Sequence, residues 1–210
     1  MLRVLIVDDH AITRDGLRRI LSDYPEPLEL GEAANGSQTL SLVRQEHWDL
    51  VLLDISLPDK SGLEVLKVIK KDQPDIAVIV LSMYPMDQYA LRVLKAGGSG
   101  YLSKETASDQ LLLAVQKAAA GGTFITAELA EHMARELARK STRPLHEELS
   151  DREFEVLRLI ATGKTATEIS RHLSLSVKTV STYRARILQK MSMRHNAELT
   201  HYAIINRLVF

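Results

Sequence analysis

The stretch Leu50-Val51-Leu52-Leu53-Asp54 decides how the first half of this chain folds. Its four apolar residues do not alternate with polar ones, and a second run, Val78-Ile79-Val80-Leu81, has the same character. A strand with one solvated face alternates, whereas a strand of a parallel sheet is buried on both faces and forms a continuous apolar run. The two runs therefore indicate the central strands of a parallel sheet.

Outward from these runs, short apolar segments and longer helical segments take turns along the first 120 residues. In the segment 62–72, Leu63, Leu66 and Ile69 recur at helical spacing. Five strands separated by helices indicate βαβ units, so we expect an α/β fold with a doubly wound, five-stranded parallel sheet. The predicted strands are 2–7, 28–31, 50–53, 76–81 and 99–102, and the predicted helices lie near 12–22, 37–46, 62–72, 87–96 and 107–120.

The composition is that of an ordinary globular protein, with 45% hydrophobic and 26% charged residues. The absence of cysteine excludes disulfides, thiolate metal sites and cysteine nucleophiles. The apolar run at 4–7 is too short for a signal peptide or a membrane span. We therefore expect a cytoplasmic protein with no membrane partner.

The charge is unevenly distributed, although lysines plus arginines equal aspartates plus glutamates at 27 each. The net charge is −4 over residues 1–123, −1 over 124–150 and +5 over 151–210. An acidic N-terminal part and a basic C-terminal part are typical of a protein that binds nucleic acid at one end.

The second half of the chain is helical in pattern. An Ala-rich helix is expected at 127–139, and the polar, Pro-containing segment 140–144 indicates a linker. Capping motifs then open successive helices, which predicts an all-α four-helix domain. Ser150 with Glu153 opens the helix 151–162, Thr165 with Glu168 opens the one to 173, Ser176 caps 177–191, and a fourth helix spans 196–207. The expected parts are thus a sheet domain at 1–122, a helical linker at 123–148 and a helical domain at 149–210.

Polar side chains gather where the predicted strands end. Asp8 and Asp9 follow the first strand, Asp54 ends the third, Ser82 ends the fourth, and Lys104 lies just past the fifth. Because ligands of parallel sheets bind at the carboxyl ends of the strands, we expect these groups to converge. Carboxylates at one edge favour Mg²⁺, and the lysine and the hydroxyl suit phosphoryl oxygens. Asp54 would then attack a phosphorus centre and form an acyl phosphate.

These residues, with Leu57-Pro58-Asp59, Gly62 and Tyr101, resemble the receiver domain of two-component response regulators over residues 1–122. The resemblance implies a flavodoxin-like (CheY-like) fold. It implies that a phosphohistidine of a sensor histidine kinase donates to Asp54. It also implies Mg²⁺ as the one cofactor, held by Asp8, Asp9, Asp54 and the Ser56 backbone carbonyl, and a switch pair formed by Ser82 and Tyr101.

One departure concerns the peptide bond after the lysine. Receivers commonly have a proline there with a cis bond, but Lys104 is followed by Glu105. A cis bond before a residue other than proline costs about 3–4 kcal/mol, so the geometry of this bond stays open. Regulators with this kind of output domain often lack that proline.

Two short helices joined by a tight turn indicate a helix-turn-helix, with 165–173 as the supporting helix and 177–191 as the DNA reader. From Lys178 to Arg194 there are five basic residues and no acidic one. The N-terminus of the reader helix also offers a positive dipole to phosphate. The expected DNA contacts are Lys178, Thr179, Ser181, Thr182, Arg184, Arg186 and Lys190.

The stretch 149–157, with Gly163, Glu168-Ile169, Thr179-Val180 and Lys190-Met191, resembles the LuxR-type output domain. With the receiver, the whole chain resembles a NarL/FixJ-type transcriptional regulator, and its tail at 196–203 resembles the GacA/UvrY branch. This family often has a lysine after Thr-Val where this chain has Ser181, so that phosphate contact is in doubt. The resemblance implies a homodimer in which the last helix pairs with a second copy on DNA.

Other interpretations stay open at the level of single residues and of function. Asp9 alone could cap a loop, Tyr101 could be a sheet-edge aromatic, and the basic stretch could be a solvated helix face. A phosphohydrolase with Asp54 as nucleophile usually needs a second acid two residues on, where this chain has Ser56, so we expect a regulator and not an enzyme. A docking module independent of phosphate is a third possibility. The receiver could pair through 87–96 with 99–102, or through its first and fifth helices.

Overall fold

The computed structural model describes residues 1–83, 86–105, 107–138 and 144–209. These residues form two compact units, Met1–Ala138 and Arg139–Phe210. Each unit has its own hydrophobic core. Among the described helices, none combines the length and the apolar character that crossing a bilayer requires.

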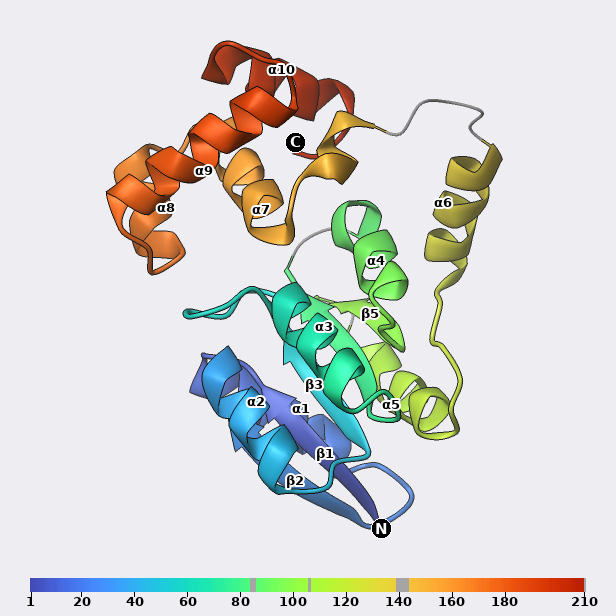
Figure 1. The fold of residues 1–210 in the computed structure, drawn as a ribbon. Helices are drawn as coiled ribbons and strands as arrows, with labels where there is room; N and C mark the ends of the chain where they lie inside the picture. The colour runs from blue at the N-terminus through green and yellow to red at the C-terminus, as the bar shows by residue number, and fades with distance from the viewer. Residues whose placement is uncertain (84–85, 106, 139–143, 210) are drawn as a thin grey trace. The chain divides into compact units, whose positions relative to one another are not determined.

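The first unit is built on a parallel sheet with the strand order β2-β1-β3-β4-β5 (Figure 1). The order reverses between β1 and β3, and this is the point where ligand sites of doubly wound sheets form. The predicted α/β fold is confirmed. The strands are β1 (Leu2–Val7), β2 (Leu28–Ala33), β3 (Leu50–Asp54), β4 (Ala77–Ser82) and β5 (Gly100–Ser103).

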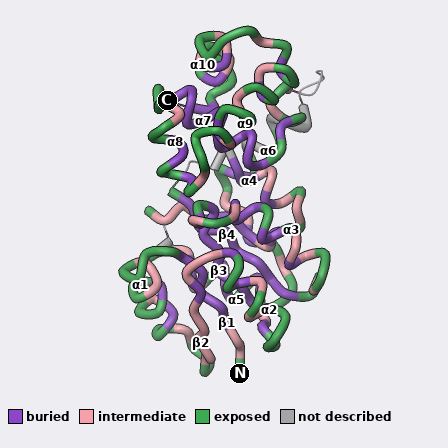
Figure 2. Tube along the Cα trace, turned by 60° about the vertical axis from the view of Figure 1, so that its left-hand side comes forward, coloured by how far each residue is buried: buried purple, intermediate pink, exposed green. Residues whose placement is uncertain are grey.

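Helices cover both faces of the sheet. Helices α1 and α5 pack together on one face, and α2, α3 and α4 follow one another on the other. Every residue of β3 and β4 is buried, which is why their apolar runs do not alternate (Figure 2). The helices are α1 (Ala11–Leu21), α2 (Gly36–Gln45), α3 (Gly62–Asp72), α4 (Met86–Lys95) and α5 (Ala107–Ala119).

Element bounds agree with the sequence prediction to within about two residues. The main difference is β2, which extends through Ala33 because Glu32 and Ala33 continue the pairing with Ile6 and Val7. The peptide bond between Lys104 and Glu105, which the sequence left open, is trans.

The chain after α5 remains with the first unit. Gly121 has φ +79°, a left-handed conformation that glycine adopts without a Cβ penalty, and it turns the chain back to the sheet. Phe124 pairs with Gly100 of β5, and α6 (Ala127–Ala138) then packs against α4. The sequence assigned this segment to a linker, whereas the compact unit reaches Ala138. The predicted linker residues 140–143 and the predicted end of the helix at 139 lie outside the described residues.

The second unit consists of helices among its described residues. Both predicted capping boxes are present, at Ser150/Glu153 and at Thr165/Glu168. Its core includes Phe154, Val180 and Leu199. The unit contains a short 3₁₀ turn that the sequence did not predict, η1 (Leu145–Glu148), then α7 (Asp151–Ala161), α8 (Ala166–His172), α9 (Val177–Lys190) and α10 (Asn196–Ile205).

Candidate functional site

The carboxyl ends of β1, β3 and β5 bring three charged side chains into direct contact. The ammonium of Lys104 lies 2.7 Å from Asp8 Oδ2 and 2.7 Å from Asp54 Oδ2. Lys104 is separated from these partners by 96 and 50 residues in sequence. The parallel sheet therefore brings Asp8, Asp54 and Lys104 together at its carboxyl edge, as the sequence predicts.

Burial dominates the electrostatics of this cluster. Burial has the largest effect on Asp54 and raises its pKa, Lys104 and the Ser56 amide lower it, and the nearby charge of Asp8 raises it, with a net pKa of about 6. Burial alone would lower the pKa of Lys104, but the carboxylates of Asp54 and Asp8 outweigh it and raise that pKa. Both pKa values can be raised at once because one ammonium lies between two buried carboxylates. It is stabilised by both of them, but its single charge does not fully offset the burial of either.

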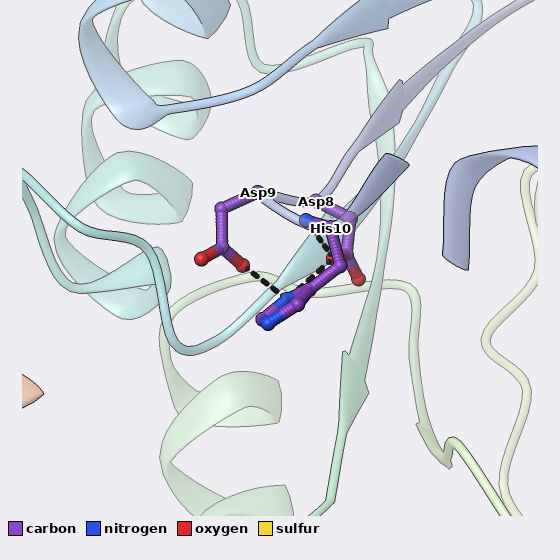
Figure 3. Close-up of side chains that lie close together, drawn as sticks. All are labelled: Asp8, Asp9 and His10. Carbon is purple, nitrogen blue, oxygen red and sulfur yellow. Dashed lines mark hydrogen bonds and ion pairs between the residues drawn. The ribbon is translucent and has the colours of Figure 1, made fainter. Parts of the chain in front are cut away.

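Asp9 and His10 form the outer part of the site (Figure 3). His10 Nδ1 lies 2.7 Å from Asp9 Oδ1 and 3.4 Å from Asp8 Oδ1, and the His10 amide donates to Asp8 Oδ1 at 2.9 Å. The possible ligand atoms of Asp8, Asp9 and His10 lie within 4.8 Å of one another. Sequence reasoning missed His10, although its position directly after the acid pair was a usable signal.

The loop after Asp54 is held by close backbone contacts. The Ser56 amide donates to Asp54 Oδ1 at 3.2 Å, and the Gly62 amide donates to the Ile55 carbonyl at 2.8 Å. A Cβ on Gly62 would lie 2.2 Å from the Asp54 carbonyl oxygen, so only glycine fits at this position. Gly62, the first residue of α3, therefore allows the close backbone packing around Asp54.

Asp59 of the same loop serves another purpose. Its carboxylate accepts hydrogen bonds from the Gly36 amide at 2.8 Å and from the amide and hydroxyl of Ser37 at 2.8 and 2.6 Å. Burial would raise the pKa of Asp59, but these hydrogen bonds outweigh it and lower that pKa. Asp59 therefore ties the loop to the start of α2.

Ser82 and Tyr101, the expected switch pair, lie on neighbouring strands. Ser82 ends β4, Tyr101 lies in β5 opposite Val80, and both side chains are fully buried. The aromatic ring therefore occupies an inward position in this structure.

The second candidate site is the exposed face of α9. Lys178, Thr179, Thr182, Tyr183 and Arg186 line a shallow hollow of about 290 Å³. Sequence reasoning missed Tyr183, although it lies four residues after Thr179 and three before Arg186, on the same face of the helix.

The three predicted DNA contacts that do not line this hollow also have partners within the domain, as do the Thr179 and Thr182 hydroxyls. The Ser181 hydroxyl donates to the Val177 carbonyl at 3.0 Å, and Arg184 Nε donates to Asn196 Oδ1 at 2.6 Å. Lys190 lies at the opposite end of α9 from Lys178, and its ammonium is 2.6 Å from Glu153 Oε2. The geometry thus gives Lys190 a structural partner in the capping box of α7.

Both halves of the chain match known protein families. Residues 4–116 match the model of the response regulator receiver domain, and residues 147–203 match that of bacterial regulatory proteins of the luxR family. The chain is a response regulator. Its receiver domain is followed by a LuxR-type DNA-binding domain.

Curated relatives align with this response regulator over nearly their whole length. The response regulator UvrY of Escherichia coli K12 is 36% identical over 97% of this chain and 94% of the relative. The response regulator GacA of Pseudomonas aeruginosa PAO1 is 35% identical over 100% of this chain and 98% of the relative. The resemblance to the NarL/FixJ-type regulators and to the GacA/UvrY branch is therefore confirmed.

Solved structures of the response regulator RcsB have the same fold. RcsB from Salmonella enterica serovar Typhimurium, bound to promoter rprA with the phosphomimetic BeF₃⁻, aligns with a TM-score of 0.64 at 27% identity, over 96% of this chain and 98% of that one. An RcsB–DNA complex aligns with a TM-score of 0.59 at 26% identity, over 100% and 99% of the two chains.

The acidic pocket of the response regulator fits a hard divalent cation. Its donors from Asp8, Asp9 and Asp54 are oxygens, the ligands that Mg²⁺ prefers. When all three carboxylates are ionised, the single charge of Lys104 leaves two negative charges uncompensated, and a divalent cation would balance them. The donor set and the charge therefore both suit Mg²⁺.

Proposed function

We propose that this regulator accepts a phosphoryl group on Asp54 from a sensor histidine kinase and thereby controls its binding to DNA. The observation that carries the proposal is the contact of Lys104 with both Asp8 and Asp54 in a buried pocket at the carboxyl edge of the sheet. A cation placed 2.7 Å from the Asp54 carboxylate is within reach of an oxygen of a phosphoryl group attached there.

Each residue of the pocket has a separate task in this proposal. A carboxylate oxygen of Asp54 attacks phosphorus, and the donor's phosphohistidine nitrogen leaves. Lys104 and the Ser82 hydroxyl bind phosphoryl oxygens, while Asp8, Asp9, Asp54 and the Ser56 carbonyl would hold Mg²⁺. That ion neutralises the charge of the two reacting anions when it is bound.

The output of the proposal is sequence-specific DNA binding by a homodimer. Lys178, Thr179, Thr182, Tyr183 and Arg186 would face the major groove, because they share the exposed face of the second helix of a helix-turn-helix. Ser181 and Arg184 remain proposed contacts, whereas Lys190 is left out because of its pairing with Glu153. The similar protein RcsB was solved on DNA, and two of its dimers were solved on two DNAs. Since the target is DNA, we expect this regulator to act in the cytoplasm.

The surface of α10 supports pairing of two output domains. Ile204 and Ile205 are 55% and 65% exposed, and Met193, Ala197 and Tyr202 line a hollow of about 470 Å³ beside them. A second copy of α10 would bury this apolar surface. Pairing two domains raises affinity because the second half-site binds intramolecularly.

The test is DNA binding and oligomeric state with and without acetyl phosphate and Mg²⁺. Wild type is compared with Asp54→Asn, and with Asp23→Asn as a control that removes an exposed carboxylate from the end of α1. We expect phosphorylation to raise the affinity and the dimer fraction of wild type and of the control, but not of Asp54→Asn. Equal affinity and equal dimer fraction in all three proteins would overturn the proposal.

A phosphohydrolase with the same nucleophile is the alternative, and turnover separates the two functions. We propose that the pocket is a phosphoacceptor and not an enzyme active site, since Ser56 occupies the position where such hydrolases need a second acid. Small phosphoesters should then release no more than one phosphate per protein. Multiple turnover that is lost in Asp54→Asn would favour the enzyme.

A further inference from the structure

The loop between Asp54 and α3 is closed at its base. Ser56 and Ser61 form an antiparallel bridge, and the Ser56 amide donates to the Asp54 carboxylate at 3.2 Å. These contacts hold the two ends of the loop together. They do not hold its tip, residues 57–60, against the rest of the receiver, so the tip needs a contact of its own.

Asp59, at the tip of this loop, supplies that contact by reaching the start of α2. Its carboxylate accepts the Gly36 and Ser37 amides at 2.8 Å each and the Ser37 hydroxyl at 2.6 Å. The next amide, of Gln38, donates to the Asn35 side chain at 2.8 Å. The first amides of a helix have no partner within it. Here the first three are all bonded, two of them by a residue of another loop.

The start of α2 is shaped to receive this loop, and α2 and α3 lie side by side on one face of the sheet (Figure 1). A Cβ on Gly36 would lie 2.8 Å from Val65 Cγ2 and 3.2 Å from Asp59 Oδ1, so a side chain there would push the loop away. The charge also fits, because a helix N-terminus is the positive end of its dipole. Burial would raise the pKa of Asp59, but its hydrogen bonds outweigh it, so Asp59 stays ionised at neutral pH.

The contact of Asp59 joins the two sides of the cation pocket. The Asp8 amide donates to the carbonyl of Ala33, the last residue of β2, and the chain runs from there directly into α2. The start of α2 is therefore tied to the strand end that bears Asp8. Asp59 lies in the loop that follows Asp54 and contains Ser56. Its hydrogen bonds thus fix one side of the pocket relative to the other.

We propose that Asp59 is a positioning residue for the cation site, which holds the Ser56 carbonyl in place for Mg²⁺ before the ion binds. The inference rests on the proposed function, because it concerns the same pocket. Asp59 acts through the backbone of its loop, since its carboxylate is occupied by α2. A site whose oxygens are already in place loses less conformational freedom when it binds an ion, so its affinity is higher.

Calorimetric titration of the full-length protein with Mg²⁺ alone tests this role. Asp59→Ala should bind Mg²⁺ about tenfold more weakly than wild type, as expected when an outer partner of a metal site is lost. Ser37→Ala removes one of the three hydrogen bonds and no charge, and it should weaken binding about threefold. The control is Asp72→Asn, which removes a carboxylate that pairs with Arg44 at the C-terminal ends of α3 and α2 and should bind like wild type.

Phosphorylation kinetics distinguish positioning from a general loss of structure. With acetyl phosphate as the donor, Asp59→Ala should need about tenfold more Mg²⁺ for its half-maximal rate. At saturating Mg²⁺ its rate should come within about twofold of wild type, because the bound ion then holds the loop. A saturated rate that is reduced as much as the Mg²⁺ affinity would show a distorted pocket and would overturn the proposal.

The outcomes separate this role from the proposed function. If wild type binds Mg²⁺ and Asp59→Ala and Ser37→Ala bind it as tightly, Asp59 is not a positioning residue and the proposed function stands. An equal loss of affinity in Asp72→Asn, or a loss confined to Asp59→Ala, would assign the effect to charge and would also overturn the role. If wild type neither binds Mg²⁺ nor is phosphorylated, the proposed function itself fails. Should Asp59→Ala fail to fold, Ser37→Ala decides alone, and wild-type affinity in that variant overturns the proposal.

Discussion

At the scale of single residues, the charge state of Asp54 connects stability to function. The side chain is almost fully buried beside Asp8, and its pKa is raised to about 6 although Lys104 is in contact with it. The folded protein therefore pays a cost to keep this carboxylate ionised at neutral pH. A phosphoacceptor must be ionised to act as a nucleophile, so the same burial that shapes the pocket opposes its reactive form.

Asp54→Asn should therefore stabilise the protein at pH 7. The folded pKa lies above the ordinary value of 3.8, so the folded state binds more protons between pH 4 and 6 and stability falls as the pH rises through that window. At 1.36 kcal/mol per pKa unit, the gain at pH 7 is about 2–3 kcal/mol. Urea unfolding of both proteins from pH 4 to 8 measures this gain in the free energy of unfolding.

The stabilisation by Asp54→Asn should depend on pH. The stability difference between Asp54→Asn and wild type should shrink as the pH falls and vanish below about pH 4, where both side chains are neutral. Asp23→Asn, which removes an exposed carboxylate, should show no such profile. A difference that is constant from pH 4 to 8 would contradict the assignment of the raised pKa to Asp54.

Two glycines should respond in opposite directions to the same substitution. Gly62→Ala places a Cβ 2.2 Å from the Asp54 carbonyl oxygen, so the loop must shift, at a cost of about 1–3 kcal/mol and with slower phosphorylation. Gly16 lies within α1 with no atom within 4 Å of a new Cβ, so Gly16→Ala should stabilise by about 0.5–1 kcal/mol. Thermal midpoints and acetyl phosphate kinetics measure both, and a tolerated Gly62→Ala would show that the loop is not tightly held.

At the scale of elements, we propose that α9 divides its basic residues between DNA and its own domain. Lys178 lies at the first turn and lines the exposed hollow, whereas Lys190 lies at the last residue and contacts Glu153 of the α7 cap. Burial would raise the pKa of Glu153, but the hydrogen bonds from Lys190 and Ser150 outweigh it and lower that pKa. The exposed hollow thus extends from Lys178 to Arg186, and the last residue of the helix, Lys190, is used for packing within the domain.

Salt titrations of DNA binding should distinguish these two lysines. Lys178→Ala should reduce the slope of log affinity against log salt by about 1 per domain, since one phosphate contact is lost. Lys190→Ala should leave the slope unchanged and lower the stability of the domain by about 1 kcal/mol, as expected when a charged hydrogen bond is lost. An equal reduction of this slope in both variants would indicate that Lys190 also contacts DNA.

At the scale of the whole molecule, the boundary between the two units lies after α6. The unit that contains the sheet includes Phe124 and Leu129, which are 7% and 1% exposed. Residues beyond α5 thus contribute to the core of the receiver and are more than a tether.

Truncation should show this contribution. A fragment of residues 1–138 should be more stable than one of residues 1–122 by about 2 kcal/mol, the burial of two large apolar side chains less the entropy of ordering the segment. Urea unfolding of the two fragments measures the difference. Equal stability would mean that the segment 123–138 is not part of the receiver.

The sequence by itself determined the elements and the composition of the proposed phosphoryl site. Continuous apolar runs depend only on burial on both faces, and capping boxes depend on residues three apart, so both are visible in the chain without a fold. The convergence of Asp8, Asp54 and Lys104 also followed, because parallel strands bring their carboxyl ends to one edge.

Only the tertiary structure decided what these residues do to one another. The raised pKa of Asp54, the partner of Lys190 and the docking of α6 on α4 all depend on contacts between segments far apart in the chain. No local pattern distinguishes a lysine that faces DNA from one that faces a buried carboxylate. The same holds for α6, whose alanine-rich sequence suits an exposed linker helix and a docked helix equally well until the surface opposite it is known.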